Sequence, residues 1–226
     1  MNCWMKVEGR IPIQRFFLMD GIRTRDVLDM DGLQSSTESI LGFLAVRQRE
    51  PHGFFGGYLV VNSRARPLEF HCTLPVQPTR AQQILYGATL TEYICGELIA
   101  RALLGKAAAR PQLVLTDCFA SLAVRHWMDQ PLLHVAADTL PSMKGRIEDR
   151  TTDDLEGFTI PELTVRDSRY VSRQRHNATF SCLTSYGRDM DGLDCLADFE
   201  GSLDLLEPFS RIVEALAEAH PRSRAA

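Results

Sequence analysis

Long apolar runs are missing from this 226-residue sequence, and no stretch approaches the roughly 18 apolar residues of a membrane span. A secretory leader is not indicated either, because polar residues interrupt the apolar stretch 11–19 and no small-residue cleavage site follows it. The six cysteines lie far apart and form no CxxC pair, which argues against a disulfide framework. These absences predict a cytoplasmic protein with no membrane partner, in which most cysteines act as small hydrophobes.

Charge of either sign is not in large excess, because 25 Lys and Arg residues oppose 29 Asp and Glu residues and leave a formal net charge of -4. Nucleic acids and anionic membranes are bound through a basic field, so this balance argues against both as general partners. The hydrophobic content of 45% is typical of a globular protein and is sufficient for the packed core of one large domain.

Complete catalytic motifs are also missing. Gly53, Gly56 and Gly57 form neither GxGxxG nor a Walker loop, so we interpret them as residues that let a strand begin and twist. Ser121 lies outside a GxSxG elbow, and the His-x-Glu and Pro-Cys-x-x-Cys motifs of zinc deaminases do not occur. Any enzymatic activity would therefore depend on side chains that the fold brings together.

What the sequence does contain is a regular pattern of strands and helices between residues 39 and 137. Apolar runs bounded by prolines and glycines predict five strands, at 40–47, 58–61, 68–74, 112–115 and 132–136. Residues 178–183 are a candidate late strand outside this region. Apolar residues at helical spacing predict helices at 80–104 and 118–128, with Gly87 as a candidate break in the first. Ile84 and Leu85 belong to the apolar stripe of that first helix, so we expect them to face the core.

This order of elements, strand-strand-strand-helix-strand-helix-strand, predicts an α/β fold with a mixed sheet of about five strands. It is similar to the ribonuclease-H-like arrangement, as an analogy of element order only, because such folds carry many functions. Residues 1–29 are a candidate dispensable extension. We expect four regions: an irregular N-terminal extension at 1–38, the α/β core at 39–137, a polar excursion with an acidic segment at 138–203, and a C-terminal helix at 204–220 that packs on the core.

The densest group of reactive side chains is Glu69-Phe70-His71-Cys72-Thr73, in the third predicted strand. Strand alternation puts Glu69, His71 and Thr73 on one face and Cys72 on the opposite, apolar face. If the polar face lines a cleft, Glu69 can orient His71 and raise its basicity, as a general base requires. The alternative is the ordinary wet face of an antiparallel hairpin, and the sequence favours this simpler interpretation.

A zinc site could draw on His71, Cys72, Cys95 and Cys118, which are good zinc ligand types. However, His71 and Cys72 face opposite ways on their strand, and Cys95 lies on the apolar side of its helix. The sequence therefore gives a zinc site little support.

A two-metal site could draw on Glu69, Glu97 and Asp117. Asp117 follows a predicted strand at its carboxyl end, where α/β sites commonly lie. Ribonuclease-H-like enzymes carry an acid on the first strand, and 40–47 has none. Asp117 is alternatively the N-cap of the helix that begins at Cys118, and this interpretation is favoured.

Together these patterns predict a non-enzymatic partner-binding subunit or adaptor of a cytoplasmic multi-protein system, with no cofactor. The acidic segment 189–207 is expected to contact a basic region of a protein partner. The alternative is a metal-dependent hydrolase or nuclease that uses Glu69 and His71 with Glu97 or Asp117, and magnesium or zinc as the divalent metal. The sequence predicts neither the identity of the partner nor the oligomeric state.

Overall fold

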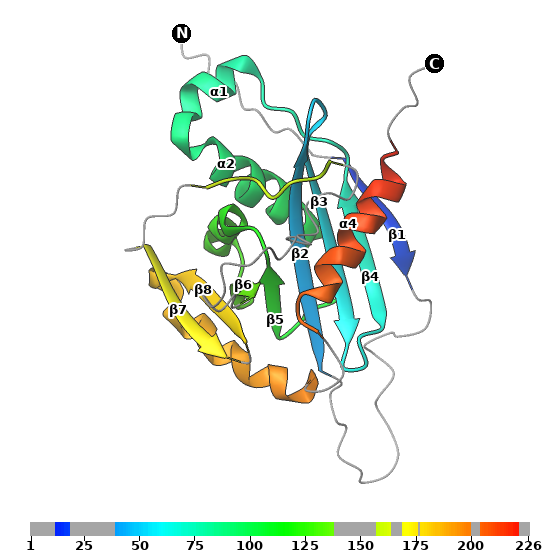
Figure 1. Cartoon of the computed structure of the whole chain (residues 1–226), viewed down its shortest axis with the longest axis vertical. Coiled ribbons are helices and arrows are strands. Elements are labelled where there is room, and N and C mark those ends of the chain that lie inside the picture. Colours follow the sequence, from blue (N-terminus) through cyan, green and yellow to red (C-terminus); the bar gives the residue numbers. More distant parts are fainter. Residues whose placement is uncertain are drawn as a thin grey trace, which may run out of the picture.

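The computed structural model of the chain describes residues 12–18, 39–137, 157–163, 169–175, 177–199 and 204–221. Within these residues the protein is a mixed α/β fold built on one eight-stranded sheet (Figure 1). The strands are β1 (Ile13–Leu18), β2 (Ile40–Arg49), β3 (Gly53–Asn62), β4 (Pro67–Thr73), β5 (Leu113–Thr116), β6 (Leu132–Ala137), β7 (Tyr170–Arg175) and β8 (Ala178–Leu183).

The strand order across the sheet is β1-β4-β3-β2-β5-β6-β8-β7. β2 lies parallel to β5 and β5 lies parallel to β6, whereas the other neighbouring pairs are antiparallel. The carboxyl ends of β2, β5 and β6 therefore meet at one edge of the sheet. This edge is where ligand sites of α/β folds commonly form.

The prediction of about five strands was too low. Strand β8 coincides with a late strand that the sequence suggested, but β1 and β7 were not predicted. Each of these two lies at an end of the sheet and has one neighbouring strand in the described part of the chain. An edge strand needs little apolar surface, so β7 (YVSRQR) shows no run that would reveal it, and β1 lies within a segment expected to be irregular.

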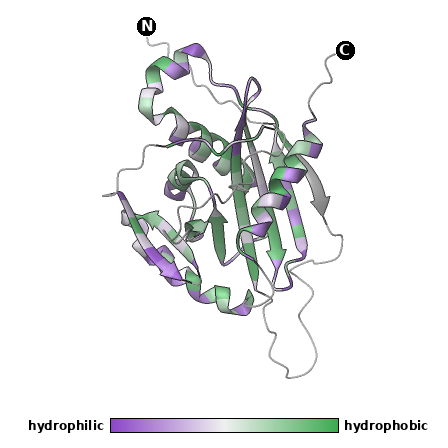
Figure 2. Ribbon diagram, in the orientation of Figure 1, coloured by the Kyte–Doolittle hydropathy of each residue, from purple (hydrophilic) through white to green (hydrophobic). Residues whose placement is uncertain are grey.

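Helical segments cover both faces of the sheet (Figure 1). Segments η2, α3 and η3 pack against one face, and η6 and α4 pack against the other. Figure 2 shows hydrophobic colouring concentrated in the central strands between these two layers. The helical segments are α1 (Arg80–Tyr86), η1 (Gly87–Thr89), α2 (Leu90–Glu92), η2 (Tyr93–Ala100), α3 (Arg101–Lys106), η3 (Phe119–Trp127), η6 (Thr184–Phe199) and α4 (Glu207–Ala219).

Two adjacent glycines in β3 allow both layers to approach the sheet closely. A Cβ atom on Gly56 would lie 2.2 Å from Cγ2 of Ile99 in η2, and one on Gly57 would lie 2.4 Å from Cγ2 of Ile212 in α4. Real Cβ atoms do not come this close to a neighbour, so the helices could not sit here over larger residues. These glycines therefore serve helix packing rather than only the start and twist of a strand.

The predicted helix 80–104 is divided at Gly87, as its position suggested. Gly87 has a φ of 50° and a ψ of -122°, a conformation that residues with a side chain rarely adopt. The helical path then resumes through η1 and α2 and ends at Lys106. The break turns α1 away from the axis of the segments that pack on the sheet (Figure 1).

The acidic segment is more ordered than a polar excursion would be. Within it, η6 buries four apolar side chains in the core beside α4, namely Met190, Leu193, Leu196 and Phe199. Asp189 is buried too, although it lies in the region predicted as a polar excursion with an acidic segment. No helix in the described ranges is long and apolar enough to cross a membrane.

Candidate functional site

The polar face of β4 is closed, so it is neither a cleft nor a wet face. Glu69, His71 and Thr73 are 4%, 2% and 0% exposed, because η2 and α3 cover this side of the sheet. The wet-face prediction assumed a hairpin covered on one side only. Since both sides are covered, the polar atoms of these residues must find partners inside the protein.

Glu69 binds the loop that follows α3. Its carboxylate accepts hydrogen bonds from the backbone N–H groups of Ala108 and Ala109, with N···O distances of 2.9 to 3.1 Å. His71 lies on the same side, with its Nε2 atom 2.6 Å from Oε1 of Glu69. Burial raises the pKa of Glu69, but the hydrogen bonds from the two amides and His71 outweigh it and hold that pKa below its ordinary value. The pair therefore joins β4 to this loop.

A second buried pair lies where the carboxyl ends of β2 and β5 meet. The guanidinium of Arg47, 1% exposed, donates from Nη1 to Oδ1 of Asp117 over 2.9 Å, and its Nη2 contacts Oδ2 of the same carboxylate. Asp117 thus binds Arg47 and is not a helix N-cap, the position that Cys118 takes. Arg47 was not among the predicted site residues, although an arginine on the same face as Phe43 and Ala45 in an apolar strand indicates a buried partner.

His134 in β6 lies beside this pair and was also missed. Its ring stacks on Phe119 with a centroid distance of 3.8 Å, and the side chain is 6% exposed. Burial lowers the pKa of His134 to about 4, and the nearby Asp117 opposes this only in part. His134 is therefore neutral at neutral pH.

The structure does not gather the carboxylates of the predicted two-metal site. Glu69 binds the 107–110 loop, Asp117 binds Arg47, and Glu97 is a half-buried residue of η2 near Tyr93. Across the described residues, no group of three or more His, Cys, Asp or Glu side chains is placed to hold a metal ion.

The four candidate zinc ligands do not converge on one point, as the ligands of a zinc site must. Cys95 and Cys118 are buried next to each other, and a hydrogen bond between their thiols together with burial raises the pKa of Cys95. Cys72 packs in the core on the opposite side of the sheet from His71. A protonated, buried thiol is a poor zinc ligand, because the metal binds the thiolate.

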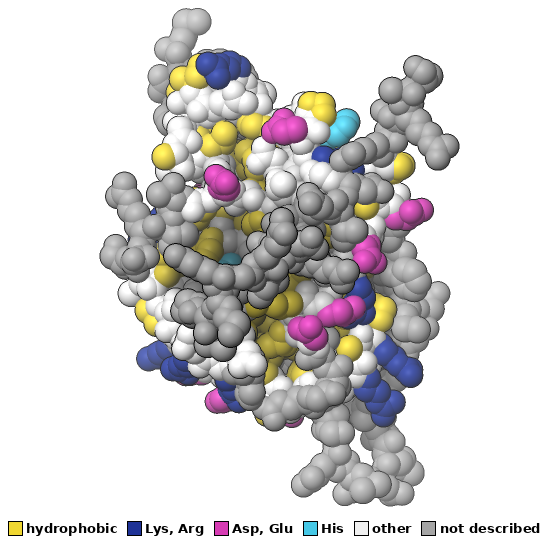
Figure 3. Space-filling view, viewed as in Figure 1, with side chains coloured by type: hydrophobic (Ala, Val, Ile, Leu, Met, Phe, Trp, Pro, Cys, Tyr) yellow, Lys and Arg dark blue, Asp and Glu magenta, His cyan; other side chains and the backbone are white. Residues whose placement is uncertain are grey.

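Helix α1 exposes its apolar side chains to solvent, whereas a core helix buries them. None of its seven residues is buried, and its two large apolar side chains, Ile84 and Leu85, are 67% and 82% exposed. The expectation that they face the core is therefore wrong. With Ala81, which is also exposed, they form an outward stripe at i, i+3 and i+4. Figure 3 shows hydrophobic side chains at the surface around the end of the molecule where α1 projects.

The conformation of α1 is fixed at both of its ends. At its start, Thr79 and Gln82 form a capping box, in which Gln82 N–H donates to Thr79 Oγ1 over 3.2 Å and Gln82 Oε1 accepts from Thr79 N–H over 2.9 Å. At its end, the Tyr86 ring stacks on Tyr93 of η2 with a centroid distance of 4.0 Å. The stripe is thus presented on a preformed helix.

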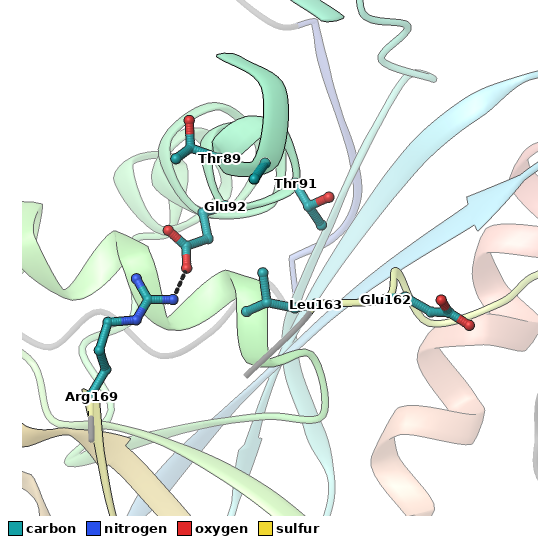
Figure 4. Close-up of a pocket in the computed structure, with 7 residues that line it drawn as sticks. Thr89, Thr91, Glu92, Glu162, Leu163 and Arg169 are labelled. Carbon is teal, nitrogen blue, oxygen red and sulfur yellow. Dashed lines mark hydrogen bonds and ion pairs between the residues drawn. The ribbon is translucent and has the colours of Figure 1, made fainter. Parts of the chain in front are cut away.

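A pocket of about 610 Å³ opens between the continuation of this helix and the segment 157–163 (Figure 4). An ion pair spans one side of the pocket, where Arg169, the residue before β7, contacts Glu92 of α2 over 2.5 Å. Leu163 reaches in from the opposite segment, and the two threonines Thr89 and Thr91 lie on the helical side. The ion pair links α2 to the start of the β7 region and so supports the segment from which α1 projects.

Comparison with protein-family models finds no model that matches this chain, and comparison with curated proteins finds no relative. The functional argument therefore depends on the geometry described above. Among the candidate reactive side chains, Glu69 pairs with His71 and Asp117 pairs with Arg47 inside the protein. The projecting helix presents unpaired apolar surface to solvent.

Proposed function

We propose that the protein is a non-enzymatic partner-binding subunit, and that it docks helix α1 into an apolar groove of a protein partner. The observation that carries this proposal is the exposure of Ile84 and Leu85 on a helix that buries none of its residues. An amphipathic helix normally turns its apolar stripe to the core. An apolar stripe that faces solvent on a capped helix is suited to binding in a groove of a partner. Such grooves bind apolar side chains spaced at i, i+3 and i+4 along a helix.

The size of the stripe is sufficient for a specific anchor. Burial of a leucine or isoleucine side chain contributes about 1.5–3 kcal/mol relative to leaving it exposed. The capping box and the stack of Tyr86 on Tyr93 fix the helix before binding, which reduces the conformational entropy that docking would cost. A partner groove that covers both Ile84 and Leu85 would therefore gain most of this free energy as affinity.

The chemistry of α1 narrows the class of partner. The helix carries one cation, Arg80, no acidic residue and two glutamines. The groove is therefore expected to be apolar, with a neutral or acidic rim near the start of the helix. The outer side of η6, where Asp191, Asp194 and Asp198 are exposed at i, i+3 and i+7, supports a further contact with a basic region of a partner.

The core arrangement supports the analogy to a ribonuclease-H-like fold as a proposal about architecture. Strands β4-β3-β2-β5-β6 lie in that order, the first three antiparallel and the last two parallel to β2. Two-metal chemistry gains no support from it. The carboxyl end of β2 carries Arg47 where such an enzyme needs an acid, and a metal would have to displace this guanidinium from Asp117. The free thiols of the described cysteines support a reducing, cytoplasmic location.

The experiment that tests docking begins with a photoreactive amino acid at Gln83, an exposed position of α1, in the full-length protein in its own cells. The same amino acid at Gln174, exposed in β7, is the matched control. A protein that crosslinks from Gln83 and not from Gln174 is then purified. Its affinity is measured by calorimetry for the wild type, for the Ile84→Ala/Leu85→Ala double variant and for Val171→Ala, a control at an apolar side chain that is 40% exposed.

The double variant is expected to lose about 2–4 kcal/mol of binding free energy, which is roughly 30- to 1,000-fold in Kd. The Val171→Ala control should change Kd by less than about threefold. Equal affinity of the double variant and the wild type would overturn the proposal, as would equal crosslinking from both positions. Sedimentation velocity that shows self-association lost in the double variant would instead assign the groove to a second copy of the chain.

A further inference from the structure

A row of aromatic and cationic side chains runs from the start of α3 across the end of η3 to η6. Trp127, the last residue of η3, is 43% exposed. The guanidinium carbon of Arg101, the first residue of α3, lies 5.7 Å from the centre of the Trp127 ring. On the other side, the rings of His126 and Trp127 meet edge to face with a centroid distance of 5.9 Å. The row ends at Tyr186 of η6. We call Arg101, His126, Trp127 and Tyr186 the aromatic ridge.

The ridge is anchored to the core through a chain of contacts. Asp189, 3% exposed, accepts from Nε and Nη2 of Arg125 over 2.8 and 3.1 Å. The guanidinium of Arg125 then stacks on the Tyr186 ring, 4.3 Å from its centre. The Tyr186 hydroxyl lies 3.1 Å from Nδ1 of His126, the neighbour of Trp127. The Tyr186 and His126 rings are thus held in place before any ligand binds, and the Trp127 ring lies between His126 and Arg101.

Tryptophan, tyrosine and arginine are the side chains enriched in binding hot spots, and here Trp127 and Arg101 are exposed while Tyr186 is half-buried. Their rigidity lowers the entropy that ordering would cost on binding. The ridge uses none of the residues of α1. It would therefore act as a surface in its own right, whether or not α1 docks as proposed.

The charged side chains around the ridge indicate which charge its ligand carries. Arg125 is neutralised by Asp189, whereas Arg101 is exposed and makes no ion pair with another described residue. A guanidinium that lies over an aromatic ring still offers its N–H groups to a carboxylate at the edge. Arg188 is also exposed two residues beyond Tyr186, and the exposed Asp129 is the nearest acid in sequence to Trp127.

We propose that the aromatic ridge is a docking surface for an acidic segment of a protein partner, in which a carboxylate stands beside an apolar side chain. The carboxylate binds Arg101, and the apolar side chain packs on Trp127. Single-stranded nucleic acid could also stack on exposed rings, but it needs a broad basic field. The net charge of -4 and the exposed aspartates on η6 do not supply such a field, whereas a short acidic segment needs only the local cation Arg101 beside Trp127.

The sequence supplies a direct reporter for the test, because Trp127 is one of only two tryptophans and the other is Trp4. In a Trp4→Phe background, tryptophan fluorescence reports Trp127 alone. The probe is a six-residue peptide of alternating glutamate and leucine, titrated into the full-length protein. A peptide of alternating lysine and leucine and a single-stranded oligothymidylate are titrated in parallel.

The glutamate peptide is expected to change the Trp127 fluorescence saturably, and the lysine peptide is not. Arg101→Gln should weaken the glutamate peptide about tenfold, and Asp129→Asn should tighten it about twofold, because the two substitutions change the local charge in opposite directions. Arg173→Gln, at an exposed arginine of β7, is the matched control and should leave Kd within about twofold. These three variants alter exposed side chains, so circular dichroism should show an unchanged fold.

Three results would overturn the proposal. They are the lack of a saturable response to the glutamate peptide, an equal response to the lysine peptide, and an Arg101→Gln variant that binds like its Arg173→Gln control. Tighter binding of oligothymidylate than of the glutamate peptide would make the ridge a nucleic-acid surface and would overturn it as well.

Discussion

The buried histidine His134 makes a specific prediction about how stability depends on pH. Its pKa is lowered from 6.5 to about 4 by burial, and its ring stacks on Phe119 in a site that is 6% exposed. The unfolded chain therefore binds more protons at this residue than the folded protein between about pH 6.5 and pH 4. Folding stability from this source is fully present above pH 6.5 and is lost as the pH falls toward 4.

The magnitude follows from the two pKa values. Acidification from pH 7.5 to pH 5 protonates His134 in the unfolded chain but leaves it mostly neutral in the folded protein, which costs about 2 kcal/mol of unfolding free energy. The full shift, reached below pH 4, corresponds to about 3 kcal/mol. Urea unfolding followed by circular dichroism at the two pH values measures this loss by linear extrapolation.

The His134→Gln variant separates this histidine from the other groups that titrate. Burial also lowers the pKa of His220, so this second histidine contributes in the same direction, and His220→Gln is the matched control. The loss between pH 7.5 and pH 5 should be about 2 kcal/mol smaller in His134→Gln than in the wild type. If both proteins lose the same free energy, His134 does not remain neutral in the folded protein and the reasoning is refuted.

Three further predictions concern stability, each measured by chemical denaturation. Leu85→Ala should change the unfolding free energy by less than about 0.5 kcal/mol because its side chain is 82% exposed, whereas Leu103→Ala in the core should cost about 2–5 kcal/mol. Gly56→Ala should cost about 1–3 kcal/mol, because the added Cβ would lie 2.2 Å from an atom of η2. Asp117→Asn should cost about 3–5 kcal/mol, since it leaves the buried cation Arg47 without this carboxylate.

Each of these predictions has an outcome that contradicts it. A loss on Leu85→Ala that approaches the loss on Leu103→Ala would show that α1 packs on the core. A Gly56→Ala variant as stable as the wild type would mean that η2 does not approach β3 closely. A neutral Asp117→Asn variant would mean that the carboxylate does not stabilise the Arg47 cation.

The central strands could be predicted from the sequence because they are covered on both faces. β2 and β5 read as apolar runs, and the position of β4 follows from its bounding turns and prolines. The edge strands β1 and β7 could not be predicted in the same way. β7 is mostly exposed and is specified by its pairing with β8 rather than by an apolar pattern of its own. Strand pairing depends on residues elsewhere in the chain, so the periodicity of the β7 sequence itself does not reveal it.

The candidate site shows the same division between local and long-range information. Alternation along β4 correctly places Glu69 and His71 on one side, and a hydrogen bond joins them. Whether that side is wet depends on η2 and α3, which local alternation does not reveal. Helical periodicity likewise groups Ile84 with the residues of η2, but the break at Gly87 separates α1 from that layer. The apolar side chains of α1, which follow the same helical periodicity, therefore face solvent.

The distribution of polar and apolar groups is the observation on which the proposed binding function rests. Groups whose types suggest chemistry are paired inside the protein, as Glu69 is with His71 and Arg47 is with Asp117. A catalytic group must reach its substrate, and a carboxylate held by a buried guanidinium must first lose that partner. Exposed Leu85 needs no such rearrangement to dock, because a groove only has to exclude the water that now covers it. Ile84 and Leu85 can therefore contact a partner without disrupting the fold.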